Sequence, residues 1–409
     1  MKLFVPKERS PETRVAISPD TVKRLTGMGF DVTFEKGAGE LSRITDEALT
    51  AAGAKVATAK GAGAADVVLK VNRPTAAEAK SYKKGALVLA AMDPHCHESE
   101  IRSLASAGIS AFAMEFMPRI TRAQSMDILS SQANLAGYQA VIEGAATFDR
   151  ALPMMMTAAG TVPAARVFVM GAGVAGLQAI ATARRLGAVV TATDVRAAAG
   201  EQVESLGAKF IMTEALKDAS GEGGYARELT ADEQKAQAEL VASHIAKQDI
   251  VITTALIPGR PAPRLVTKAM LASMAPGSVV VDLAVERGGN VEGSKAGQIA
   301  RVGNVSVVGY ENMAGRLAAT ASQLFAKNLV AFLETMVDGE SKKLNVNLED
   351  ELVAATLLTH GGKVVHPLFA KESAAKPAAK SAAKPAAKPA GKAPAKKKPA
   401  TAADKGAKS

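Results

Sequence analysis

The segment RVFVMGAGVAGLQAIATARRLGAVVTATDVR, residues 166–196, decides the fold of this chain. It contains a short apolar run, a glycine-rich turn, a helical stretch and a second apolar run. The turn has the form G-x-G-x-x-G, with glycines at Gly171, Gly173 and Gly176. The first glycine permits the tight turn, the second lets the backbone approach a pyrophosphate, and the third lets the helix pack on the strand. The segment is therefore typical of a dinucleotide-binding β-α-β unit.

An acidic residue follows this turn at the spacing expected for a ribose contact. Asp194 lies eighteen residues after Gly176, at the end of the second apolar run. A carboxylate there can accept hydrogen bonds from the adenosine ribose hydroxyls and would repel the 2′-phosphate of NADP. The pattern therefore predicts NAD(H) as the preferred cofactor. Arg196 is expected near the adenosine end, where it softens this preference without reversing it.

Apolar runs alternate with helical patterns on both sides of this unit. Five runs lie within residues 1–116 (LFVP, DVTFEKG, DVVLKV, ALVLAA and SAFAMEF), and six lie within residues 166–310. Between the first two runs, Ser18 can cap a helix that Gly27 can end. Alternation of this kind predicts an α/β fold with two doubly wound, Rossmann-like parallel sheets covered by helices.

Two long helical patterns are expected to join the sheets. One covers about residues 122–146, and the other, about 317–336, returns the chain to the first sheet. The junction between two domains is a common position for a ligand site. The predicted domains are a Rossmann-like N-terminal domain of residues 1–129 and 317–370, an NAD(H)-binding domain of residues 130–316, and a tail of residues 371–409.

The basic character of the chain belongs to this tail. Residues 371–409 contain eleven lysines against Glu372 and Asp404, a surplus of nine, whereas the whole chain carries +10. The Lys/Ala/Pro-rich sequence offers nothing to bury, so the tail is expected to be disordered. It could bind anionic lipid, nucleic acid or an acidic partner, or it could be a solubilising spacer. The spacer is favoured, and no nucleic-acid partner is expected, because no aromatic or large apolar residue is interleaved with the lysines.

Cysteine content and hydropathy indicate a cytoplasmic protein. Cys96 is the one cysteine among 409 residues, so no internal disulfide can form, which suits a reducing compartment. The opening MKLFVPKERS becomes charged too early for a signal peptide. The longest apolar candidate, residues 167–183, is interrupted by the glycine turn and Gln178, so no transmembrane span is expected.

The segment PRITRAQSMDILSSQANLAG, residues 118–137, is unusually polar for the start of a long helix. One interpretation is structural, because Thr121-x-x-Gln124 matches a capping box and an acid in the early turns suits the helix dipole. The other is functional, because a polar wall beside the nucleotide fold could hold a carboxamide and a ribose. Three-residue steps place the last three of its polar residues on neighbouring helix faces. The four candidates for the catalytic segment are Arg119, Gln124, Asp127 and Ser130.

These motifs together identify a family. From the opening FVPKE-x-x-x-E-x-RVA to the closing GGKVVHP, the chain resembles the NAD(H)-binding alpha-1 subunits of proton-translocating NAD(P) transhydrogenases, which are related to the alanine dehydrogenases. The resemblance implies that Arg119, Gln124 and Asp127, with Ser130 beside them, hold the nicotinamide end and face NADP(H) on a partner. It also implies that residues 218–230 form a mobile loop, which from the residues alone could equally be an ordinary exposed loop. The implied cofactor contacts are Val174, Asp194, Val195, Arg196, Gly224, Tyr225, Gln237 and Leu256.

The same resemblance implies an assembly. Membrane-spanning and NADP(H)-binding subunits would be the partners, hydride transfer would be coupled to proton translocation, and this chain would be a homodimer. It would touch the cytoplasmic face of the inner membrane only through those partners, and it would be inactive in transhydrogenation without them.

Two other functions compete with this one. Alanine dehydrogenases share the pattern, and Arg14 and Lys70 match residues that hold the substrate there. However, ALVLAAMDPHCHE has no histidine at the strand end, and VDLAVERGGNVEG has Glu286 where an aspartate is expected, which argues against amino-acid oxidation. The third possibility is a non-enzymatic NAD-binding protein that acts through its basic tail. The run His95-Cys96-His97 is interpreted as a loop, because consecutive ligands seldom fit one tetrahedral ion, so no metal is expected.

Overall fold

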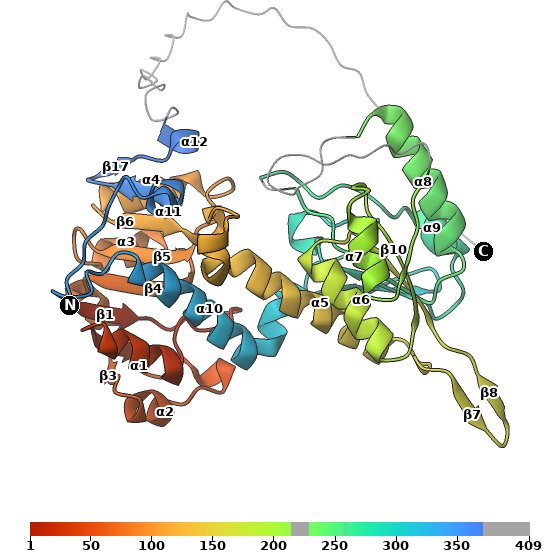
Figure 1. The fold of residues 1–409 in the computed structure, drawn as a ribbon, viewed down its shortest axis with the longest axis horizontal. Coiled ribbons are helices and arrows are strands. Elements are labelled where there is room, and N and C mark those ends of the chain that lie inside the picture. The colour runs from red at the N-terminus through yellow and green to blue at the C-terminus, as the bar shows by residue number, and fades with distance from the viewer. Residues whose placement is uncertain (214–228, 258, 371–409) are drawn as a thin grey trace, which may run out of the picture.

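The computed structural model describes residues 1–213, 229–257 and 259–370. These residues form two α/β units, which lie at opposite ends of the molecule and are joined by two long helices (Figure 1). The first unit is built on an eight-stranded sheet and the second on a seven-stranded sheet. The predicted fold class of two helix-covered sheets is confirmed, while the predicted disorder of residues 371–409 lies outside the described residues.

The first sheet has the strand order β17-β16-β6-β5-β4-β1-β2-β3. Strands β1 to β6 are parallel, whereas β16 is antiparallel to β6 and β17 is antiparallel to β16. The strands are β1 Lys2–Val5, β2 Asp31–Glu35, β3 Lys55–Ala57, β4 Val67–Asn72, β5 Leu87–Ala91, β6 Ser110–Ala113, β16 Leu357–His360 and β17 Lys363–Val364. The helices of this unit are α1 Pro19–Gly27, α2 Asp46–Ala51, α3 Ala76–Ser81, α4 Glu98–Ser106, α11 Glu351–Thr356 and α12 Pro367–Ala370.

The second sheet has the order β11-β10-β9-β12-β13-β15-β14 and is parallel except for β14 at its edge. The chain moves from β9 to β10 on one side and later to β12 on the other, so the topological switch point lies at β9. Its strands are β9 Arg166–Met170, β10 Val189–Thr193, β11 Lys209–Phe210, β12 Ile250–Thr253, β13 Val279–Asp282, β14 Gln298–Val302 and β15 Val305–Gly309. Its helices are α6 Val174–Arg185, α7 Ala199–Ser205, α8 Ala231–Ile245 and α9 Lys268–Ser273.

Local signals in the sequence account for the first helix. Ser18 caps α1 by accepting a hydrogen bond from the backbone N–H of Thr21, and the helix ends at Gly27 as expected. Val22 and Leu25 are buried on one face of α1 and pack in the core of the first unit. Capping therefore fixes where the helix begins, and burial of its apolar face fixes how it lies on the sheet.

The two helices that join the units are α5, Ile128–Thr147, and α10, Ala318–Glu334. Helix α5 contributes Ile128 to the core of the first unit and Ala140 to the core of the second, so it spans both. Helix α5 also approaches α6 very closely. A Cβ atom added to Gly137 would lie 2.0 Å from the carbonyl oxygen of Ala175, so only glycine allows this contact.

The beginning of the first joining helix was predicted wrongly. Residues Thr121–Met126 form the 3-10 turn η4, and the expected capping box at Thr121 and Gln124 does not form. Helix α5 instead begins after Asp127, whose carboxylate accepts the backbone N–H of Ser130 at 2.9 Å. The reason is that Ala123 and Met126 are buried in the first core, which holds the preceding turn away from the axis of α5.

A hairpin of β7, Met155–Thr157, and β8, Gly160–Val162, projects from the second unit (Figure 1). Its side chains are largely exposed, and Met156 is among the most exposed apolar residues. The sequence patterns did not predict this hairpin, because it is too short to show an alternating pattern. Among the helices of the described residues, none combines the length and apolarity needed to cross a bilayer.

Candidate functional site

The glycine-rich turn lies between β9 and α6, at the switch point of the second sheet. Gly171 has φ +105, and a Cβ there would lie 2.4 Å from Thr254 Oγ1. A Cβ on Gly176 would lie 1.8 Å from the Gly171 carbonyl oxygen. The packing of the protein itself therefore requires these two glycines, the first for its left-handed backbone and the second for the close approach of helix to strand.

Gly173 has a different environment. It is the N-cap residue of α6, and a Cβ there would meet no described atom within 4 Å. Protein packing does not require glycine at this position, but close approach of a ligand would. The N–H groups of the first turn of α6 point toward this open space, and a helix N-terminus attracts anions. The turn therefore fits the pyrophosphate of a dinucleotide.

Asp194 follows β10 beside this turn and is only 7 % exposed. Its Oδ2 accepts the backbone N–H of Ala172 at 2.7 Å, and its Oδ1 accepts the backbone N–H of Arg196 at 2.9 Å. The Arg196 side chain donates to both oxygens, from Nε to Oδ1 and from Nη2 to Oδ2, each at 2.9 Å. Burial raises the pKa of Asp194, but these hydrogen bonds and the charge of Arg196 outweigh it, so the pKa is lowered. The carboxylate is therefore ionised and already paired.

The other predicted nucleotide contacts differ in their exposure. Val174 is 42 % exposed at the start of α6, and Leu256 is 47 % exposed in the loop after β12. Val195 follows Asp194, and Gln237 is half-buried along α8. Gly224 and Tyr225 lie outside the described residues.

A buried amide that the sequence patterns did not single out holds the loop that carries Leu256. Asn290 is fully buried; its Oδ1 accepts the Ala255 N–H at 3.1 Å, and its Nδ2 donates to the Ala255 oxygen at 2.9 Å. The same Nδ2 donates to the Pro263 oxygen at 2.8 Å. The sequence gives only a weak signal, an asparagine after two glycines in ERGGN, because its partners are distant along the chain.

The polar segment from Arg119 to Ser130 is held against the first unit. Asn328 on α10 donates from Nδ2 to the backbone oxygen of Ser125 at 2.8 Å and accepts from Ser131 Oγ at 2.7 Å. The segment is thereby fixed while the side chains of Arg119 and Gln124 remain exposed. Close contacts bring Asp127 and Ser130 together, since Asp127 accepts both the backbone N–H and the hydroxyl of Ser130.

Helix α5 connects this segment with the glycine turn. Asp127 caps the helix, and Gly137, ten positions later, touches Ala175 in the first turn of α6. Ten residues of α-helix rise about 15 Å, so one continuous element sets the spacing between the two. Asn134 supports the contact by donating from Nδ2 to Gln178 Oε1 at 3.3 Å.

The residues expected for the competing functions are otherwise engaged. Lys70 is fully buried with Glu8 at 3.3 Å and Glu78 at 3.1 Å, and Arg14 pairs with Glu12 at 2.9 Å.

The run His95-Cys96-His97 belongs to a loop contact rather than a metal site. His97 Nδ1 lies 3.2 Å from Asp93, and Arg287 donates to Cys96 Sγ at 2.9 Å. In the portion of the chain that the structure describes, no three His, Cys, Asp or Glu residues are grouped to hold a metal ion.

Comparison with known proteins agrees with this arrangement. Models of the N-terminal and C-terminal domains of alanine dehydrogenase/PNT match residues 4–136 and 140–367. The chain is 56% identical over 384 residues to an NAD(P) transhydrogenase alpha subunit of Rhodospirillum rubrum, covering 91% of this chain and 100% of that protein. The alanine dehydrogenase of Halomonas elongata is 31% identical, covering 91% of this chain and 96% of that protein.

Solved structures give the same result. The crystal structure of transhydrogenase from Sinorhizobium meliloti superposes with a TM-score of 0.80 at 63% identity, covering 90% of this chain and 100% of that one. An L-alanine dehydrogenase superposes with a TM-score of 0.75 at 26% identity, covering 91% of this chain and 98% of that one. The chain therefore belongs to the alanine dehydrogenase/PNT family, in which its high-identity relatives are NAD(P) transhydrogenase alpha subunits.

Proposed function

We propose that this chain binds NAD(H) at the glycine turn and serves a proton-translocating transhydrogenase, in which hydride passes directly between NAD(H) here and NADP(H) on a partner subunit. The observation that carries the proposal is the rigid connection between the two halves of the site. Helix α5 begins at the Asp127 cap and touches the first turn of α6 at Gly137. The exposed Arg119 and Gln124 thus lie beside the N-terminus of a helix whose other contacts are those of a nucleotide fold.

The proposed roles follow from these positions. The N-terminus of α6 binds the pyrophosphate, and Asp194 with Val195 and Arg196 binds the adenosine ribose. Gln124 orients the nicotinamide, while Arg119 and Asp127, supported by Ser130, hold the segment and the carboxamide. NADH supplies the hydride when bound, and no protein group forms a covalent bond with it. Catalysis by this chain is then mainly orientation and proximity.

The proposal extends to the assembly and the domain bounds. The relatives named as transhydrogenase alpha subunits support partner subunits that bind NADP(H) and span the membrane. We place the chain as a homodimer on the cytoplasmic face of the inner membrane, attached through those partners. The proposed domains are residues 1–129 with 317–370, and residues 130–316, because the two hydrophobic cores draw on these ranges with α5 crossing between them.

Reconstitution tests the proposal. The purified chain is added to membranes that carry the NADP-binding and membrane-spanning subunits but lack this one, and hydride transfer from NADPH to an NAD analogue is followed. Activity is expected only in the mixture, with the chain alone and the membranes alone as controls. Failure of the mixture would remove the proposal, and alanine-dependent reduction of NAD by the chain alone would support an amino-acid dehydrogenase instead.

A further inference from the structure

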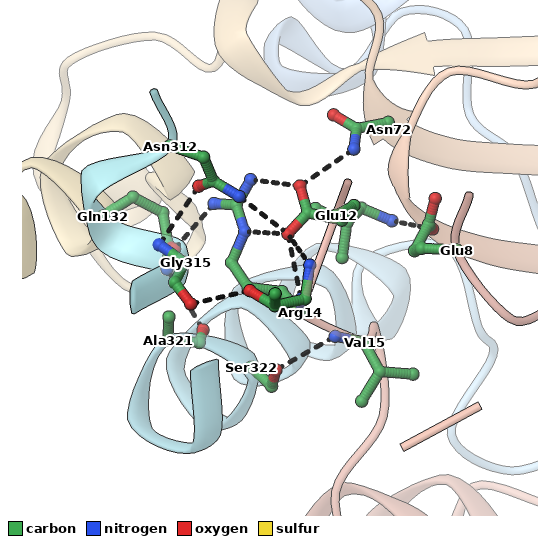
Figure 2. Close-up of polar contacts among 12 residues, drawn as sticks. Glu8, Glu12, Arg14, Val15, Asn72, Gln132, Asn312, Gly315, Ala321 and Ser322 are labelled. Carbon is green, nitrogen blue, oxygen red and sulfur yellow. Dashed lines mark hydrogen bonds and ion pairs between the residues drawn. The ribbon is translucent and has the colours of Figure 1, made fainter. Parts of the chain in front are cut away.

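A buried polar cluster lies where the two units meet, away from the glycine turn (Figure 2). We name it the junction cluster. Its side chains come from the loop after β1, from β4, from α5 and from the segment between β15 and α10 (Figure 2). The junction cluster consists of Glu12, Arg14, Asn72, Gln132 and Asn312.

Glu12 is the centre of the cluster, with 7 % exposure and six hydrogen bonds to its carboxylate. Oε1 accepts the backbone N–H groups of Thr13 and Arg14 at 3.0 and 2.9 Å, and Arg14 Nε at 2.9 Å. Oε2 accepts Arg14 Nη2 and Asn72 Nδ2, each at 2.9 Å. The sixth donor is Asn312 Nδ2, at 3.0 Å from Oε1. The other five donors come from the first unit, whereas Asn312 lies on the segment that leaves the second sheet.

Asn312 is itself held firmly to the second unit. Its backbone is left-handed, with φ 47 and ψ 53, and its N–H donates to the Glu286 carboxylate. The next residue, Met313, is buried in the second core. The Asn312 Oδ1 accepts the Gly315 N–H at 3.1 Å and so caps the turn that leads into α10. The Asn312 amide therefore cannot move relative to the second unit without breaking several contacts.

Two further contacts of the same loop cross the junction. Thr13 Oγ1 donates to the Gly315 oxygen at 2.6 Å, and Arg14 Nη1 donates to Gln132 Oε1 at 2.9 Å. The loop of residues 12–14 therefore holds both joining elements. Gln124 is fixed to the first unit and the glycine turn to the second, so this junction controls the spacing between the two halves of the site.

From this geometry we propose that Asn312, through its bond to Glu12, is a positioning residue for hydride transfer, because it sets the angle between the two units. The inference rests on the proposed function for its catalytic consequence. It predicts that breaking the bond changes the spacing between the units and the rate of transfer, while NADH affinity, which depends on the second unit alone, stays the same.

A matched pair of variants tests it. Asn312→Asp keeps the shape and the cap but places a carboxylate against Glu12, where two buried like charges at hydrogen-bond distance repel. Asn72→Asp places the same carboxylate against the other oxygen of Glu12, but within the first unit. If Asn312→Asp does not fold, Asn312→Gly takes its place, since glycine adopts the left-handed backbone without strain and removes the bond.

Three measurements are made on each variant. The distance between spin labels on Cys introduced at the exposed Ser106 and Ser273, in a Cys96→Ser background, reports the arrangement of the units. Titration gives the NADH Kd, and single-turnover transfer is followed in the reconstituted mixture. Because about 1 Å of misplacement can slow a reaction by about 100-fold, we expect Asn312→Asp to slow transfer at least about tenfold.

The expected result is a longer or broader label distance and slow transfer for Asn312→Asp, an unchanged Kd, and parent behaviour for Asn72→Asp. Equal label distances in both variants, or normal transfer by Asn312→Asp, would overturn the inference. A parent chain that transfers no hydride in the mixture would remove the proposed function and, with it, the catalytic consequence. The label distance would still decide whether Asn312 sets the arrangement of the units.

Discussion

Asp194 and Arg196, two residues apart, form a bidentate ion pair in which Nε and Nη2 of the guanidinium each lie 2.9 Å from a carboxylate oxygen. The Ala172 N–H occupies the remaining side of the same carboxylate. The residue expected to select NAD over NADP is therefore partly neutralised before any ligand binds. Selectivity at this position belongs to the pair rather than to Asp194 alone, because the charge that repels a 2′-phosphate is compensated.

Replacing Asp194 with Ala tests this. The variant should bind NADH more weakly and narrow the gap to NADPH, because the released Arg196 guanidinium can bind a 2′-phosphate. Fluorescence titration with both cofactors gives the two Kd values. Adding Arg196→Ala should abolish the gain toward NADPH. A retained strong preference for NADH in Asp194→Ala would show that selectivity lies elsewhere.

Replacing Gln124 with Asn shortens the side chain proposed to orient the nicotinamide. Transfer in the reconstituted mixture should slow by about 10- to 100-fold, because the reacting groups lose alignment, with the NADH Kd nearly unchanged. Ser125→Ala is the matched control, since Ser125 accepts the Asn328 bond through its backbone oxygen. Normal transfer by Gln124→Asn would disprove the role given to this residue.

The contact between α5 and α6 should depend on Gly137. Gly137→Ala places a Cβ 2.0 Å from a backbone oxygen, and such overpacking lowers the free energy of unfolding by about 1–3 kcal/mol. Gly27→Ala in α1 is the control, because its Cβ meets no described atom within 4 Å and alanine favours helix. Urea unfolding of both should show a loss for the first and no loss for the second. Equal stabilities would mean that the helices can separate at little cost.

The stability contributed by Glu12 should depend on pH. Burial raises its pKa, but the hydrogen bonds and charge of Arg14 outweigh burial and lower the pKa from 4.5 to about 2. The stabilisation is therefore complete above pH 4.5 and is lost as pH falls from 4.5 toward 2. A shift of this size corresponds to about 3 kcal/mol.

Glu12→Gln measures that contribution. It should lower the free energy of unfolding at pH 7 and approach the parent as the pH falls below 4.5. Glu204→Gln, at an exposed position on α7, is the control and should behave like the parent throughout. A deficit in Glu12→Gln that stays constant from about pH 7 to about pH 3 would mean that shape rather than charge is responsible.

Deleting residues 371–409 should leave transfer intact. The match to the Rhodospirillum rubrum relative covers all of that protein but only 91% of this chain, so the shared function does not require the additional length. Initial rates of the full and shortened chains in the same reconstituted mixture decide the point. A large loss of rate on deletion would identify the tail as a docking element.

Sequence alone was sufficient where the decisive interactions are local. The glycine pattern of residues 171–176 and the cap at Ser18 predicted a strand-turn-helix and a helix start that the structure contains. In both cases the partners lie within a few residues, so backbone geometry and one side chain decide the result. The alternation of apolar runs likewise predicted two helix-covered sheets, because burial on both faces imposes that pattern.

Tertiary structure decided what depends on distant partners. The start of α5 moved to Asp127 because the residues before it are buried in a core assembled from the whole first unit. The antiparallel edge strands β14 and β16, the Asn290 clamp and the bond from Asn312 to Glu12, across 300 positions, have no local pattern. Hydrogen bonds of this kind form only when folding brings their groups together. The sequence therefore determined the two units and the nucleotide turn, while the tertiary structure determined how the units are held against each other.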